Sequence, residues 1–142
     1  AKAPAYYGLD QPEPPADPRL GPRDQQIATD VTFRCPAVEM AELMAAKGAP
    51  VWHYEFDAAP GGERTTHAAQ IPYAFGDAQF APGLSLRPYW VQFARTGDPN
   101  APNLPDWPRF TPQSPSHVRF DANGVTPHGA LRPEICGLLD WL

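Results

Sequence analysis

The stretch PVWHYEFD, residues 50–57, decides how the chain folds. Aromatic and β-branched side chains dominate it, and such residues favour strands. Because apolar residues occupy both alternating positions, the pattern is typical of a buried strand in a parallel or mixed sheet. His53 lies in the middle of this run, where a packed histidine is the simplest interpretation. We therefore predict one buried strand here and interpret the flanking segments from it.

A helix is predicted just before this strand, over residues 35–47. Thr32 or Cys35 is placed to cap it, and Pro36 suits its first turn, where a backbone N–H is not needed. Gly48 suits its end as a C-terminal cap. Apolar residues recur at helical spacing and predict one face that fills a core, made of Ala37, Met40, Ala41 and Met44. A helix followed so closely by a buried strand indicates an α/β crossover.

A loop, a second helix, a hairpin and a last helix are predicted after the strand. Residues 58–66 form a glycine-rich loop without phosphate-binding spacing. The second helix is expected over residues 84–96, with Ser85 as its cap and Gly97 at its end. Asn123-Gly124 between short apolar runs predicts a β-hairpin. The last helix has one predicted apolar face, made of Leu131, Ile135, Leu138, Leu139 and Leu142.

Composition excludes several classes of protein. The chain of 142 residues suffices for one domain, and its net charge of −5 without a basic cluster gives nucleic-acid binding little support. No apolar run is long enough to span a membrane. The four histidines are too scattered for a metal-ligand spacing. We therefore expect no metal and no cofactor.

Proline and cysteine say more about the fold. The 20 prolines disfavour long strands and long helices. We expect residues 1–27 to be a proline-rich extended segment and residues 28–142 to form the folded part. Cys35 and Cys136 are either two buried thiols or one disulfide, and composition does not choose between them.

Several rare segments occur in a recognisable order. They are FRCPA (33–37), GAPVWHYEFD (48–57), HAAQIPYAFG (67–76) and YWVQFARTGDPN (89–100), followed by Trp107-Pro108 and a closing helix with Cys136. Together they resemble the C-terminal portion of the type B carboxylesterases, the cholinesterase-like α/β-hydrolases. The resemblance covers roughly residues 28–142. It implies an α/β class and an α/β-hydrolase fold that is incomplete without an N-terminal portion.

The resemblance also implies roles for four residues. His67 matches the catalytic histidine of the family, the base that takes a proton from a serine hydroxyl. Gln70 stands where the family usually has glutamate, so we expect it to act indirectly, through His67. Cys35 and Cys136 match the cysteines of a late disulfide. Such a bond implies an oxidising compartment, so a secreted or periplasmic location is expected.

The nucleophile that the family needs is absent from this sequence. No two glycines lie four apart, so G-x-S-x-G does not occur. The family order of serine, acid and histidine then implies that an N-terminal chain or segment supplies the serine and the acid. We expect carboxylic ester hydrolysis of a small-molecule ester in that assembly, and an inactive chain alone. A non-catalytic cholinesterase-like binding or adhesion module stays open, and Phe75 and Phe80 are candidates for lining a substrate gorge or a core.

Overall fold

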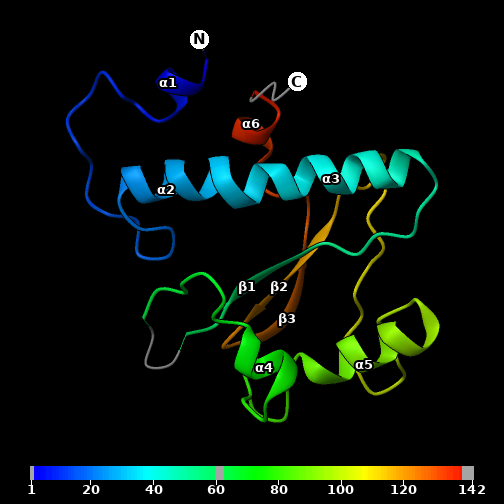
Figure 1. Cartoon of the computed structure of the whole chain (residues 1–142). Coiled ribbons are helices and arrows are strands. Elements are labelled where there is room, and N and C mark those ends of the chain that lie inside the picture. The colour runs from blue at the N-terminus through cyan, green and yellow to red at the C-terminus, as the bar shows by residue number, and fades with distance from the viewer. Residues whose placement is uncertain (1, 60–62, 139–142) are drawn as a thin grey trace.

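A computed structural model describes residues 2–59 and 63–138. Its centre is a three-stranded sheet of β1 (Tyr54–Asp57), β2 (His117–Asp121) and β3 (Gly124–His128), in the order β1-β2-β3 (Figure 1). β1 runs parallel to β2, and β2 and β3 form an antiparallel hairpin in which Asp121 pairs with Gly124. The predicted hairpin is confirmed, and the predicted strand is confirmed over residues 54–57. Residues 50–53 lie before it, and Val51 makes only an isolated bridge with Phe110. The strand and the hairpin combine into one mixed sheet because β1 joins the hairpin through β2.

The two faces of β1 differ, so the prediction of apolar residues on both is wrong. Tyr54 and Phe56 pair in register with Val118 and Phe120 of β2, and these four side chains share one face. The alternating residues of β1 are acidic, and Glu55 is in register with Arg119. Carboxylates can occupy this second face because arginines pair with them there.

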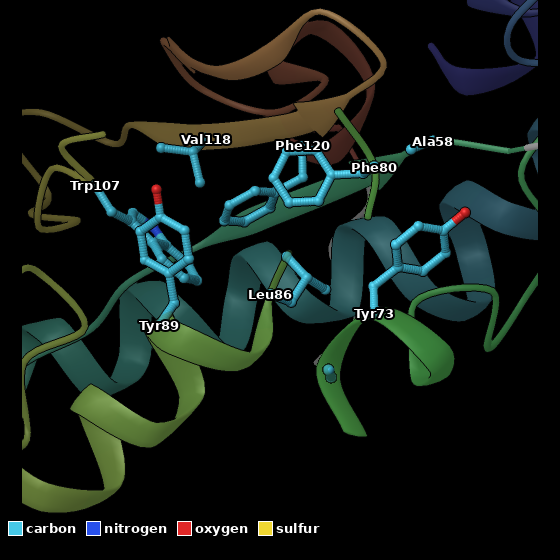
Figure 2. Close-up of a cluster of buried hydrophobic side chains, with 9 residues drawn as sticks. Ala58, Tyr73, Phe80, Leu86, Tyr89, Trp107, Val118 and Phe120 are labelled. Atoms are coloured by element: carbon cyan, nitrogen blue, oxygen red, sulfur yellow. The ribbon is translucent and has the colours of Figure 1, made fainter. Parts of the chain in front are cut away.

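The apolar face of the sheet packs on two helices, α4 (Ile71–Phe75) and α5 (Arg87–Thr96). Figure 2 shows this core, in which Tyr89 and Trp107 lie close to Phe120 of β2. Phe80 belongs to it and is 5% exposed, which favours the core interpretation over gorge lining. The core consists of Ala58, Tyr73, Ala74, Phe80, Leu86, Tyr89, Trp107, Val118 and Phe120.

The helix α5 differs at one end from its prediction. It begins at Arg87 after Leu86, and no side chain caps it, so Ser85 is not its cap. Its first turn starts with Leu86 and Tyr89 fully buried, and burial of these side chains positions the turn without a polar cap. Gly97 ends the helix in the left-handed conformation with φ +77°, as predicted.

One long helical rod covers the other side of the sheet (Figure 1). It consists of α2 (Arg23–Thr29), a π-helical turn η1 (Asp30–Arg34) and α3 (Cys35–Ala46). The prediction that a helix begins near Thr32 or Cys35 is therefore wrong, because helical hydrogen bonding continues through this region from Arg23. The end is as predicted, with Gly48 at φ +81°.

The face of α3 that was predicted to fill a core is largely exposed. Met40 is 63% exposed and Met44 is 46% exposed, whereas Ala41 is buried. Within the described residues, no other element covers this part of α3, so these side chains belong to the exposed apolar surface of the fold. Near η1 the rod contacts the sheet through Arg34, which lies 3.7 Å from Glu55 and also pairs with the buried Asp30.

Charged side chains fill the layer between the rod and the sheet. Glu55 receives Nη1 of Arg19 at 2.9 Å and Nε of Arg119 at 3.0 Å, and Arg34 lies 3.7 Å from it. Burial alone would raise the pKa of Glu55, but Arg19 and Arg119 outweigh it and hold that pKa below its ordinary value. Glu55 therefore binds the rod, the N-terminal segment and the hairpin together.

A second buried carboxylate, Asp30, joins both ends of the chain to the rod. It is fully buried, accepts Nη1 of Arg34 at 3.0 Å, and is bound by Nε and Nη2 of Arg132. The Tyr7 hydroxyl also donates to it at 2.9 Å. Burial and the hydrogen bond to Asp30 both raise the pKa of Tyr7. Both oxygens of this carboxylate thus accept hydrogen bonds.

Residues 2–27 of the predicted extended segment 1–27 are folded against this layer rather than extended throughout. They include α1 (Ala3–Tyr6) and the start of α2, so a boundary between residues 27 and 28 falls inside a helix. The Arg23 guanidinium donates to the carbonyls of Gly8 and Gln11 and holds the intervening loop. The N-terminal segment thereby contributes to the same packed unit.

The last helix and the disulfide close the chain. α6 (Pro133–Cys136) starts with the predicted proline, and a bond joins Cys136 to Cys35, 101 residues earlier. Leu131 and Ile135 are buried as predicted. The prediction for Leu139 and Leu142 lies outside the described residues.

The sheet has an open edge. Within the described residues only β2 pairs with β1 in the sheet, and large apolar side chains of α3 and α5 are exposed beyond it. They are Met40, Leu43, Met44, Val91 and Phe93. No helix of the described residues combines the length and the hydropathy needed to cross a bilayer.

The burial of Asp30 leads to a prediction about stability. Asp30→Asn should lower the free energy of unfolding by about 3 kcal/mol or more, because it leaves the Arg34 and Arg132 cations without their counter-ion. Urea denaturation measures this loss. Asp77→Asn is the matched control, since its ion pair with Arg87 is exposed and should contribute less than about 1 kcal/mol. Equal effects of the two substitutions would contradict the prediction.

Candidate active site

The candidate base, His67, lies on an exposed turn beyond the C-terminal end of β1. The turn spans residues 67–70 and leads directly into α4. Ala68 within it has φ +66°, a left-handed conformation that costs an alanine about 1 kcal/mol. Backbone strain of this kind persists where the surroundings impose it, and it is common at functional sites. The turn thus presents an imidazole to the outside of the fold in a defined backbone conformation.

Gln70 serves this turn through its backbone. It is the N-cap residue of α4, and its carbonyl accepts the N–H groups of Tyr73 and Ala74. Its side chain makes no capping hydrogen bond. Within the described residues, no hydrogen bond joins the Gln70 and His67 side chains. Gln70 is thus the last residue of the turn, and its side-chain amide is not hydrogen-bonded to the imidazole of His67.

An aromatic ring lies against the imidazole. Phe33 of η1 stacks on His67 with ring centroids 4.7 Å apart and an angle of 21° between the planes. Both residues are exposed, and Phe33 is 47% exposed. Sequence reasoning missed this contact because 34 positions separate the partners and no periodicity relates them. Phe33, two residues before Cys35 in FRCPA, carried no pattern that pointed to His67.

The other three histidines gather at the opposite end of the sheet. His117 and His128 are stacked with centroids 5.4 Å apart, and His53 lies 6.0 Å from His117. Nδ1 of His117 is 2.7 Å from the Gly129 carbonyl, and its Nε2 is buried without a partner. Among the described residues, no group of three or more His, Cys, Asp or Glu side chains is arranged to hold a metal.

Burial makes two of these histidines, His53 and His117, resist protonation. It lowers the pKa of His53 to about 4, and the neighbouring His117 adds repulsion while Glu55 opposes it. Burial also lowers the pKa of His117. The Gly129 carbonyl and Glu55 act to raise this pKa, whereas His128 and Arg119 lower it further. The interpretation of His53 as a packed histidine agrees with these surroundings.

An apolar pocket of about 360 Å³ lies between α3 and α5, away from the candidate base. Its lining is aromatic and aliphatic, and it contains neither His67 nor Phe33. The lining residues are Met44, Pro50, Val51, Trp52, Tyr54, Tyr89, Trp90, Phe93, Pro99 and Trp107. The lining has no carboxylate or imidazole, and burial raises the pKa of its two tyrosines, Tyr54 and Tyr89. The exposed rim of the pocket continues the apolar surface of α3 and α5.

The described residues bring no hydroxyl or carboxylate into hydrogen-bond contact with the His67 ring. Ser85, Ser114 and Ser116 lie in turns or loops near other elements. A hydroxyl that gives its proton to the exposed His67 ring would therefore have to come from outside the described residues.

Sequence comparison identifies the family of this chain. The sequence model described as "Carboxylesterase family" matches residues 3–137. This chain belongs to the carboxylesterase family. The matched range includes the rod, the sheet and the turn that carries His67. The family consists of serine carboxylesterases, to which the cholinesterase-like resemblance of the sequence segments also points.

Individual relatives agree with this assignment. Carboxylesterase 5A of Canis lupus familiaris is 32% identical over 117 residues, covering 66% of this chain and 20% of that protein. Acetylcholinesterase of Gallus gallus is 29% identical over 128 residues, covering 78% of this chain and 17% of that protein. The chain thus spans about a fifth of the length of the curated relatives it matches.

The fold of this chain superposes on parts of solved esterase structures. The PNB esterase superposes with a TM-score of 0.65 at 27% identity, over 79% of this chain and 26% of that one. The carboxylesterase EST55 of Geobacillus stearothermophilus gives a TM-score of 0.64 at 25% identity, over 90% of this chain and 29% of that one. The mixed α/β unit with its small sheet therefore matches part of an α/β-hydrolase carboxylesterase structure.

The buried histidines predict how the free energy of unfolding depends on pH. A histidine in the unfolded chain titrates near 6.5, whereas His53 in the fold titrates near 4. The unfolded chain therefore binds more protons between these values, and the free energy of unfolding should fall as pH is lowered from 7 to 5. Carboxylates contribute little to this change because they titrate mainly below that range.

His53→Phe removes one titrating ring and keeps a planar aromatic side chain. Urea denaturation at pH 7 and pH 5 should show a smaller loss of stability in this variant than in the unsubstituted chain. An unchanged loss would show that the cluster does not cause it.

Proposed function

We propose that this chain supplies the general base of a serine carboxylesterase, with His67 as the catalytic residue. The observation that supports it is an exposed imidazole on a strained turn beyond a parallel strand, in a chain of this family. Neutral imidazole accepts a proton from a serine hydroxyl, which then attacks the ester carbonyl and forms an acyl-enzyme. The imidazolium returns the proton to the leaving alcohol, and a water molecule completes hydrolysis by the same route.

The serine and the acid of this reaction are proposed to lie in polypeptide outside this chain. The sequence contains no G-x-S-x-G, and the described residues place no carboxylate on His67. The open edge of β1 and the exposed apolar side chains of α3 and α5 support a partner that continues the sheet. We propose that this partner is the N-terminal portion of the same hydrolase and that the present chain corresponds to its C-terminal portion.

The substrate is proposed to be a small-molecule carboxylic ester. Phe75 is 75% exposed on α4, only eight residues after His67, and is placed to meet a substrate or the partner. The disulfide between Cys35 and Cys136 supports an oxidising compartment, so we propose a secreted or periplasmic location.

Substitution of the histidine tests the proposal. His67→Ala, in an assembly of this chain with the polypeptide that carries the serine, should lower kcat for a chromogenic acyl ester by about 10³-fold or more. His128→Ala is the matched control, because it removes a histidine at the other end of the sheet and should leave kcat within a few-fold. Turnover that survives His67→Ala would reject the assignment.

A second substitution tests how Gln70 acts. Gln70→Glu adds a charge at the last residue of the turn, whose side chain makes no capping hydrogen bond. It should change kcat in the same assembly by about 10-fold or less, as expected for one altered hydrogen-bonding group. A loss as large as that of His67→Ala would make Gln70 a direct participant and would contradict this view.

A further inference from the structure

The rings of Phe33 and His67 are stacked nearly in parallel, which is unusual among the aromatic pairs of the described fold. Most aromatic pairs in the described fold meet edge to face, as in the core around Phe120. Phe33 and His67 instead stack almost in parallel, at 4.7 Å and 21°. The imidazole therefore lies with one face on the phenyl ring, and its edge, where both nitrogens are, stays free.

The phenyl ring is held by a rigid part of the fold. Phe33 lies in the π-helical turn η1, and single π-helical turns occur often at functional sites. Asp30 at the start of η1 is fully buried and bound to Arg34 and Arg132. Cys35, directly after η1, is joined to Cys136 by the disulfide. Both ends of the turn are thus fixed to the closing segment of the chain, and Phe33 between them cannot move far.

The imidazole has little else to hold it. Its ring nitrogens make no hydrogen bond within the described residues, and its backbone comes from a turn that contains the strained Ala68. A histidine on such a turn would rotate freely about its side-chain bonds without a neighbour. General-base catalysis requires the ring nitrogen to stay within hydrogen-bond reach of its target.

We propose that Phe33 is the positioning residue of the candidate base: its ring face fixes the plane of the His67 imidazole. This inference rests on the proposed function of His67. The phenyl face also favours the positive charge that the imidazole gains when it accepts a proton. Phe33 thereby acts in the step that forms and consumes the imidazolium, without contact to the reacting atoms.

The half-exposed position of Phe33 has another explanation, namely that the partner polypeptide covers it or that substrate contacts it. These alternatives differ in kinetics. A residue that contacts substrate changes KM, whereas a residue that positions the base changes kcat at nearly constant KM. A residue that only stabilises the fold changes neither once the protein is folded.

The stack itself can be tested in the 142-residue chain, without any activity. Proton NMR should show the His67 ring signals shifted upfield by the phenyl ring, with His67→Gln used to assign them. Phe33→Leu should abolish the shift, Phe33→Tyr should retain it, and Phe93→Leu should leave it unchanged. Phe93 is the matched control because it is 48% exposed, against 47% for Phe33.

Kinetics in the assembled hydrolase then test the role. Phe33→Leu should lower kcat about 3- to 10-fold at nearly unchanged KM, the size expected for loss of one aromatic pair. Phe33→Tyr should restore kcat, which also shows that the position tolerates substitution. Unchanged kcat in Phe33→Leu, a change in KM alone, or absence of the upfield shift would each overturn the proposal. If His67→Ala leaves turnover intact, the proposed function fails, whereas failure confined to Phe33 removes this inference alone.

Discussion

The fully buried carboxylate of Asp30 is the interaction on which the rest of this fold depends. A lone carboxylate in that position would be strongly unfavourable, so its burial requires the guanidinium groups of Arg34 and Arg132. Arg132 is 102 positions away and adopts φ +48°, a conformation that costs about 1–2 kcal/mol for an L-residue. The ion pair offsets this strain. The disulfide at Cys35 closes the same region, so charge pairing and a covalent bond fix one junction.

A second carboxylate carries this constraint to the candidate site. Glu55 of β1 is bound by arginines from the N-terminal segment, the rod and β2. β1 leads to the turn of His67, and the rod contains Phe33. Arg34, which contacts both Asp30 and Glu55, therefore links the two elements whose relative position decides whether the phenyl and imidazole rings meet. A change in the charged layer should reach the site through this geometry.

Local signals made much of the fold predictable. The strand formers within residues 50–57 predicted a strand, which forms over residues 54–57, and Asn123-Gly124 predicted the hairpin that β2 and β3 make. Gly48 and Gly97 adopt the left-handed conformation expected of helix ends. The pairing of Cys35 with Cys136 came from family resemblance, because spacing alone left it open.

The errors have a common cause, which is that long-range partners decided the outcome. Glu55 and Asp57 looked like members of a strand with two apolar faces, yet Arg19 and Arg119 made a charged face stable. Met40 and Met44 looked like core, yet the described residues provide no partner that covers them. The identity of His67 as a candidate base likewise depended on resemblance, and neither Ala68 nor Phe33 carried a local signal. The candidate base is held in the same way, by contacts between segments far apart in the sequence. Its turn contains the strained Ala68, and Phe33 lies against its ring from a segment that the Asp30 ion pairs and the disulfide fix in place.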